Sequence, residues 1–175
     1  MLRLFAKTLK TGVVTERIKK PTHAELEQLG IELKRQIDHN FSGSLAIRAV
    51  DAGSCNGCEL EIHALNNPFY DVERYGIHFV ASPRHADVLL VTGPVSRHMQ
   101  TALLRTYEAT PHPKWVIAVG DCASCGGEFG SSYACCGAVS NVIPVDVTIP
   151  GCPPTPETLV KGLLGLMSLS VKNKS

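Results

Sequence analysis

Two cysteines, Cys55 and Cys58, lie three positions apart just after an apolar run of the chain. Thiolates at this spacing bind zinc or iron-sulfur clusters, and they also form the reactive pair of dithiol oxidoreductases. The intervening Asn56-Gly57 permits a tight turn, and we expect Cys58 at a helix start. There, free backbone amides and the positive helix end stabilise thiolate and sulfide charge.

The chain holds five further cysteines, at positions 122, 125, 135, 136 and 152. Seven is an odd count, and the N-terminus shows neither an apolar signal segment nor a small-residue cleavage site. We therefore expect a cytoplasmic chain with reduced thiols, which favours metal or redox chemistry over structural disulfides.

The elements that would position these cysteines are short apolar runs alternating with helical patterns. We expect strands at 45–50, 77–81, 88–91, 115–119 and 145–149, and helices at 59–65, 97–108 and 157–169. Near-continuous apolar strands that alternate with helices are typical of a mostly parallel sheet with helices on both faces. The predicted fold class is α/β, flavodoxin-like.

Four of the cysteines follow predicted strands. Cys55 and Cys58 come after the first strand, Cys122 after the fourth, and Cys152 after the fifth, in the stiff sequence Gly-Cys-Pro-Pro. Sites in an open parallel sheet form beyond the carboxyl ends of its strands. The four cysteines are therefore expected to converge on one edge.

Three other chemistries compete with an iron-sulfur cluster. A zinc site of Cys55, Cys58, Cys122 and Cys125 would pair two C-x-x-C motifs, but the gap between them far exceeds the roughly 15 to 20 residues of common zinc ribbons. A dithiol pair leaves Cys122 and Cys152 without a role. Inert burial is a reasonable interpretation of Cys135 and Cys136 only.

Residues 1–42 are predicted to be a basic, helical N-terminal arm, and residues 43–175 an iron-sulfur-binding α/β domain. The first twenty residues carry a net charge of +5 and the remainder −4. An apolar pattern at Leu2, Phe5, Leu9 and Val13 would suit an anionic membrane surface or a partner's groove. A second helix is expected from Pro21-Thr22 to near Asn40. The charge pattern gives no support for nucleic-acid binding by the body.

Three groups of residues together carry a family resemblance. They are Cys-Asn-Gly-Cys-Glu at 55–59, Gly-Asp-Cys-Ala with Gly126-Gly127, and Pro-Gly-Cys-Pro-Pro at 150–154. The chain resembles the small subunit of membrane-bound, energy-converting [NiFe] hydrogenases of the formate hydrogenlyase type. That family is related to the terminal-cluster subunit of respiratory complex I. The resemblance covers about residues 45 to 170.

The resemblance implies one [4Fe-4S] cluster ligated by Cys55, Cys58, Cys122 and Cys152, with Cys122 favoured over Cys125 as third ligand. It also implies an electron-transfer role without catalytic residues. The implied partners are a large subunit with the nickel-iron site, a ferredoxin-like iron-sulfur subunit and integral membrane ion-translocating subunits. The expected location is peripheral, on the cytoplasmic side of the membrane.

Two departures narrow the choice among relatives. Complex I members carry adjacent cysteines at the first motif, whereas Cys55 and Cys58 are separated by two residues, as in hydrogenases. Soluble uptake hydrogenases add a second cluster domain and usually an export signal, and we find neither.

Near the first motif, Glu59 and Glu61 could serve a proton relay or merely stabilise a helix start. His63 could tune a cluster or be an ordinary surface residue.

Overall fold

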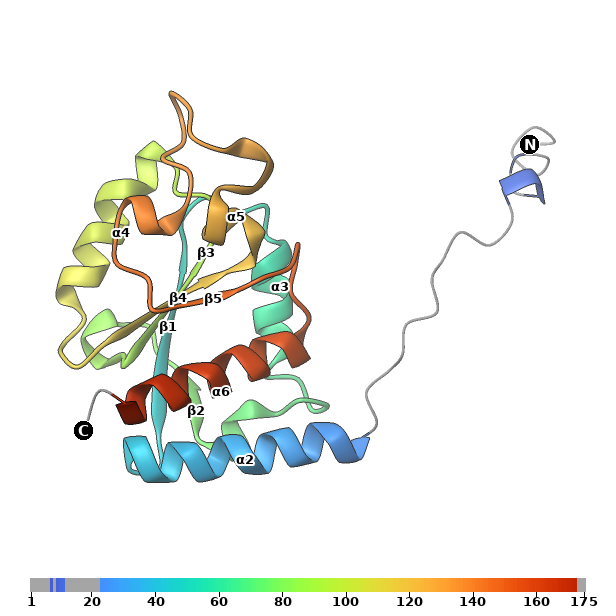
Figure 1. Ribbon diagram of the computed structural model, residues 1–175, viewed down its shortest axis with the longest axis vertical. Helices are drawn as coiled ribbons and strands as arrows, with labels where there is room; N and C mark the ends of the chain where they lie inside the picture. The colour runs from blue at the N-terminus through green and yellow to red at the C-terminus, as the bar shows by residue number, and fades with distance from the viewer. Residues whose placement is uncertain (1–6, 8, 12–22, 173–175) are drawn as a thin grey trace.

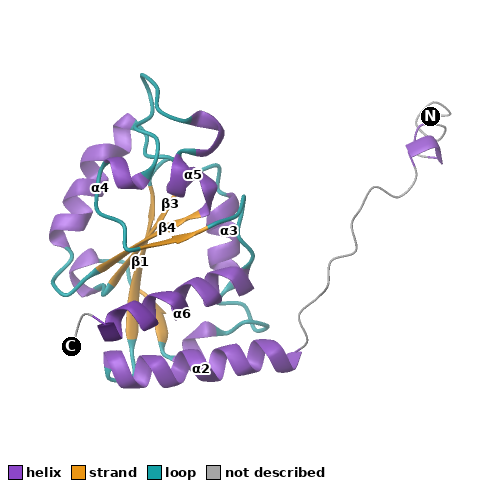
Figure 2. Ribbon diagram, viewed as in Figure 1, coloured by secondary structure: helices purple, strands orange, loops and turns teal. Residues whose placement is uncertain are grey.

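The computed structural model describes residues 7, 9–11 and 23–172. Residues 23–172 form a five-stranded sheet between two layers of helices (Figures 1 and 2). The strands are β1 (Leu45–Asp51), β2 (Ile77–Phe79), β3 (Val88–Thr92), β4 (Trp115–Val119) and β5 (Val147–Ile149). All neighbours pair in parallel, in the order β2-β1-β3-β4-β5. This is the flavodoxin-like order, so the predicted fold class is confirmed.

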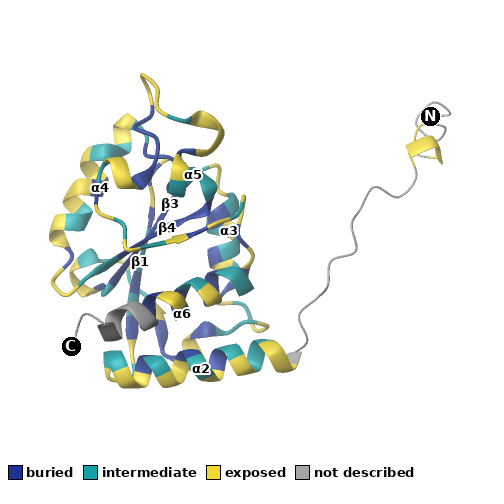
Figure 3. Cartoon of the chain, in the orientation of Figure 1, coloured by how far each residue is buried: buried dark blue, intermediate teal, exposed yellow. Residues whose placement is uncertain are grey.

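The central strand β3 shows how the sheet organises the core. All five of its residues are buried. Val88 and Leu90 belong to the core cluster on one face, whereas Leu89 and Val91 belong to the cluster on the other. Successive strand residues point to opposite faces, so a strand covered on both sides must be apolar throughout. Figure 3 shows the same pattern as buried strands inside a partly exposed helical shell.

Helices cover both faces of the sheet. The first core cluster includes residues of α2 (His23–Phe41), α3 (Gly57–Ala64) and α6 (Pro156–Lys172). The second includes residues of α4 (Arg97–Ala109) and α5 (Gly120–Cys125). Within residues 23–172 there are also four short 3₁₀ segments: η1 (Val72–Tyr75), η2 (Pro83–His85), η3 (Gly127–Phe129) and η4 (Val139–Asn141).

Helix α2 packs along α6 and belongs to the core (Figure 1). Its residues Leu33 and Ile37 are fully buried in the first cluster. Glu27 of α2 also pairs with Arg74 of η1, at 2.9 Å. The boundary between residues 42 and 43 stays a prediction, but α2 contributes apolar area to the same core as the sheet. The basic pattern of residues 1–20 and the Thr22 cap lie largely outside the described residues.

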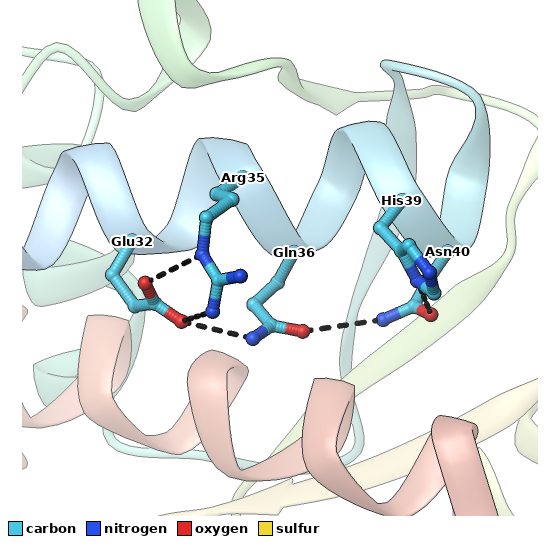
Figure 4. Close-up of polar contacts among 5 residues, drawn as sticks. All are labelled: Glu32, Arg35, Gln36, His39 and Asn40. Atoms are coloured by element: carbon cyan, nitrogen blue, oxygen red, sulfur yellow. Dashed lines mark hydrogen bonds and ion pairs between the residues drawn. The ribbon is translucent and has the colours of Figure 1, made fainter.

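One side of α2 carries a chain of polar contacts among partly exposed side chains (Figure 4). Arg35 donates two hydrogen bonds to the Glu32 carboxylate, at 2.9 and 2.7 Å, and Gln36 donates a third at 2.8 Å. The bond from Arg35, followed by that from Gln36, lowers the pKa of Glu32 to about 2. Pairs at this spacing support the helix that carries them.

Several element boundaries differ from those expected, three of them as follows. Strand β2 ends at Phe79 because the chain turns after Val80, whose N–H donates to Ile47 O, and enters η2. Strand β5 begins only at Val147, because Asp146 uses its side chain and its backbone N–H to bind Val116. Helix α3 begins at Gly57 rather than Glu59. None of the described helices is long and apolar enough to cross a membrane.

Candidate functional site

The four cysteines predicted to converge line a single cavity of about 100 Å³. Cys55 and Cys58 come from the β1–α3 junction, Cys122 from α5 directly after β4, and Cys152 from the segment between β5 and α6. The cavity walls are completed by Ser54, Gly57, Gly93, Asp121, Gly151 and Pro153. The carboxyl ends of β1, β4 and β5 therefore bring together thiols from across the chain, as the parallel topology predicts.

Glycines let backbone approach the thiols closely at two points of this site. A Cβ added at Gly120 would lie 2.8 Å from the Sγ of Cys58, and one added at Gly127 would lie 2.8 Å from the Sγ of Cys122. Both glycines also have positive φ, +83° and +53°, which other residues rarely adopt. The chain thus has no room for side chains at these two points beside the thiols.

Cys58 is the most enclosed of the four thiols, with 9% of its surface exposed. Burial raises its pKa to about 11, and the negative charges of Glu59 and of the Cys55, Cys122 and Cys152 thiolates add to this effect. Burial is also the largest cause of the raised pKa of Cys122, and the negative charges of the Cys152 and Cys55 thiolates raise it further. Ionised thiolates repel one another here, so a positively charged group bound among them would stabilise the charged form.

The remaining cysteines lie apart from the cavity. Cys125 is exposed, and its thiol donates to Asp121 O at 3.1 Å, within helix α5. Cys135 and Cys136 are buried, and their thiols donate to Val95 O and to Gln100 Oε1, both at 3.5 Å. Burial with internal hydrogen bonds matches the inert interpretation of these two.

A hydrogen-bonded group that the sequence did not reveal holds the Cys55 segment. The Ser54 hydroxyl donates to Glu59 Oε2 at 2.6 Å and accepts from the N–H of Asn56 at 3.0 Å. The hydroxyl of the buried Thr92, at the end of β3, donates to the other oxygen of Glu59. Glu59 therefore connects the first cysteine segment to β3, beyond the role of an ordinary first-turn carboxylate.

A larger cleft of about 410 Å³ lies beside the carboxyl half of β1, between α3 and the residues that follow β2. Its lining includes Arg48, Glu59, His63 and Phe79. No cysteine lines this cleft.

The residues present fit a cluster better than a single ion. Four thiols are the donor set of both a structural zinc and a [4Fe-4S] cluster. Among residues 7, 9–11 and 23–172, however, no three His, Cys, Asp or Glu side chains lie close enough together to hold one metal ion. The cavity is also several times larger than the roughly 10–15 Å³ that one water needs. Four thiols around such a space leave room for a multi-atom centre.

Comparison with protein families gives a match over most of the site-bearing region. The family model described as the 20 kDa subunit of NADH ubiquinone oxidoreductase matches residues 55–166.

Individual relatives include components of two kinds of complex. Formate hydrogenlyase subunit 7 of Escherichia coli K12 is 41% identical over 86% of this chain and 60% of that protein. A probable membrane-bound hydrogenase subunit of Pyrococcus furiosus is 50% identical over 66% of this chain and 69% of its own length. An NADH-quinone oxidoreductase subunit of Herpetosiphon aurantiacus is 48% identical over 62% of this chain and 61% of its own length. The chain thus spans about 60 to 69% of these three relatives.

A solved structure shares the fold. A chain of the membrane-bound sulfane sulfur reductase, an archaeal respiratory membrane complex, matches with a TM-score of 0.66 and 37% identity, over 75% of this chain and 74% of that one.

Proposed function

Because this chain belongs to the family of the 20 kDa subunit of NADH ubiquinone oxidoreductase, we propose that it is an electron-transfer subunit with one [4Fe-4S] cluster. The proposed ligands are Cys55, Cys58, Cys122 and Cys152. The observation that carries this proposal is their convergence, from the ends of three strands, on one cavity. A bound cluster supplies one-electron transfer, whereas bond making belongs to a partner.

The chain's own residues would set the properties of that cluster. Cys58 lies in the core and removes one side of the site from water, whereas Cys55 and Cys152 are exposed and leave another side open to a partner. Low solvent access and hydrogen bonds to sulfur are the usual determinants of cluster potential. A redox centre close to one surface suits transfer between subunits.

We further propose that the partner is a nickel-iron large subunit in a membrane-associated hydrogenase complex. Two of the relatives are named as subunits of formate hydrogenlyase and of a probable membrane-bound hydrogenase. The two residues between Cys55 and Cys58 match the hydrogenase spacing and differ from the adjacent cysteines of complex I. Electrons would arrive through a ferredoxin-like subunit, and the chain would lie peripherally on the cytoplasmic side, next to ion-translocating membrane subunits.

A second candidate has specific support. The quinone oxidoreductase relative and the sulfane sulfur reductase structure show that similar chains belong to complexes with other named activities. In that case the large subunit would lack nickel. Purifying the complex with its large subunit distinguishes the two: nickel, two C-x-x-C pairs in the large chain and hydrogen-dependent dye reduction support the hydrogenase. Absence of nickel together with absence of those pairs supports the alternative.

The cluster proposal has its own test. Anaerobically purified protein should be brown and contain about four irons per chain. Cys152→Ser should lose the cluster. Cys125→Ser should retain it, because the Cys125 thiol lies outside the cavity. Iron-free protein with bound zinc would refute the cluster. If Cys152→Ser kept the cluster and Cys125→Ser lost it, Cys125 would be the ligand in place of Cys152.

A further inference from the structure

Three aspartates form the same two-bond contact with a backbone residue of a neighbouring segment. Asp87, just before β3, accepts from Ala46 N at 2.9 Å and donates its own N–H to Ala46 O at 2.8 Å. Asp146, just before β5, does the same with Val116, at 2.8 and 2.9 Å. These two contacts lie at the amino ends of their strands, where they fix the pairing register.

The third contact lies at the opposite end of the sheet, among the cysteines. Asp121 Oδ1 accepts from Gly151 N at 2.9 Å, and Asp121 N donates to Gly151 O at 2.9 Å. Asp121 directly precedes Cys122, and Gly151 directly precedes Cys152. The contact therefore joins the segments that carry two different thiols, and both Asp121 and Gly151 line the cavity.

The Cys152 segment has few other attachments. Within the described part of the chain, residues 151–154 make no hydrogen bond to another element apart from the two with Asp121. Gly151 has a φ of +133°, and a Cβ there would lie 2.7 Å from Pro154 Cα, so its own geometry is narrowly constrained. Among the described residues, Asp121 is the only one whose side chain holds this segment by a hydrogen bond.

We propose that Asp121 is a positioning residue that fixes the Cys152 thiol relative to the Cys122 thiol for binding of the cluster. The inference rests on the proposed function, because it assumes that both thiols are ligands. A hydrogen bond to a charged group shifts an equilibrium by about tenfold or more. Asparagine retains an acceptor at Oδ1, whereas alanine has none.

The test compares Asp121→Ala and Asp121→Asn with the wild-type chain in its purified complex. The first readout is the rate at which a ferrous chelator removes iron under anaerobic conditions. The second is deuterium exchange of the Gly151 amide in cluster-free protein. We expect Asp121→Ala to speed both iron removal and Gly151 exchange by about tenfold or more. Asp121→Asn keeps an acceptor but loses the charge, so both of its rates should fall between those of Asp121→Ala and wild type.

Asp146→Ala is the matched control, since it removes the same kind of contact far from the cysteines. It should lower global stability but leave iron release and Gly151 exchange near wild type. Wild-type rates in Asp121→Ala would overturn the proposal, as would equal acceleration in Asp146→Ala. Acceleration in Asp121→Asn equal to that in Asp121→Ala would also overturn it. Wild-type protein without iron would instead refute the proposed function, and Gly151 exchange would still report on the contact.

Discussion

Replacing Gly120 by alanine tests how closely the backbone encloses the cysteine cavity. Gly120 starts α5 directly after β4, with a φ of +83°. The added Cβ would lie 2.8 Å from the Sγ of Cys58 and 3.2 Å from Gly151 O. The substitution therefore introduces backbone strain and forces a thiol or the Gly151 segment to move.

The two costs can be estimated separately. A left-handed conformation costs a non-glycine residue about 1–2 kcal/mol, and overpacking of a well-filled interior costs about 1–3 kcal/mol. Gly120→Ala should thus lower the free energy of unfolding by about 2–5 kcal/mol, a large share of the 5–15 kcal/mol typical of a domain. The displaced Cys58 should also reduce iron content.

Gly43→Ala measures the cost of the backbone conformation alone. Gly43 has a φ of +94°, and its added Cβ would meet only Asp38 Oδ1 at 3.5 Å, an ordinary contact. The free energy of unfolding of this variant should fall by about 1–2 kcal/mol, and its iron content should stay at the wild-type level. Denaturant unfolding of cluster-free protein gives the free energies, and iron analysis of anaerobic protein gives the occupancy. If Gly120→Ala were no less stable than Gly43→Ala and bound as much iron, the close approach of backbone to Cys58 would not matter.

Two further predictions concern α2. Leu33→Ala should lower the free energy of unfolding by about 2–5 kcal/mol, because Leu33 is fully buried. Ile31→Ala, at a position 58% exposed, should change it little; equal losses would mean that α2 is not part of the core. The depressed pKa of Glu32, about 2 against an ordinary 4.5, contributes stability above pH 4.5 that is lost as the pH falls toward 2. The stability gap between wild type and Glu32→Gln should therefore narrow between pH 6 and pH 2 in denaturant titrations, and a constant gap would contradict this.

The strands and the convergence of cysteines can be predicted from sequence because each depends on short-range patterns. A continuous apolar run such as 88–91 indicates a strand covered on both faces, and parallel strands place their following residues on one edge. The chain topology then brings Cys55, Cys58, Cys122 and Cys152 together without any knowledge of their distances. The start of α6 also depends on a local contact: Thr155 Oγ1 accepts from Thr158 N at 3.3 Å, the hydrogen bond of a helix cap.

The features that sequence did not reveal depend on pairs far apart in the chain. Helix α5 is six residues long and has no apolar periodicity, so the sequence places Gly-Asp-Cys-Ala near a strand end but does not predict a helix there. The contact of Asp121 with Gly151 and that of Glu59 with Thr92 join residues about thirty positions apart. No local pattern identifies such partners, because an aspartate or glutamate has the same sequence signature whether it is solvated or bound.

The position of β5 in the chain has a consequence for synthesis. The segment that carries Cys152 follows β5, which lies at one edge of the sheet and, among the described strands, pairs only with β4. A nascent chain that ends before residue 147 therefore holds three of the four thiols that line the cavity but lacks the wall that closes it. Iron delivered at that stage would meet an open, incomplete site. The four thiols come together only after β5 has been made and has docked, so the order of synthesis would place insertion of the proposed cluster late.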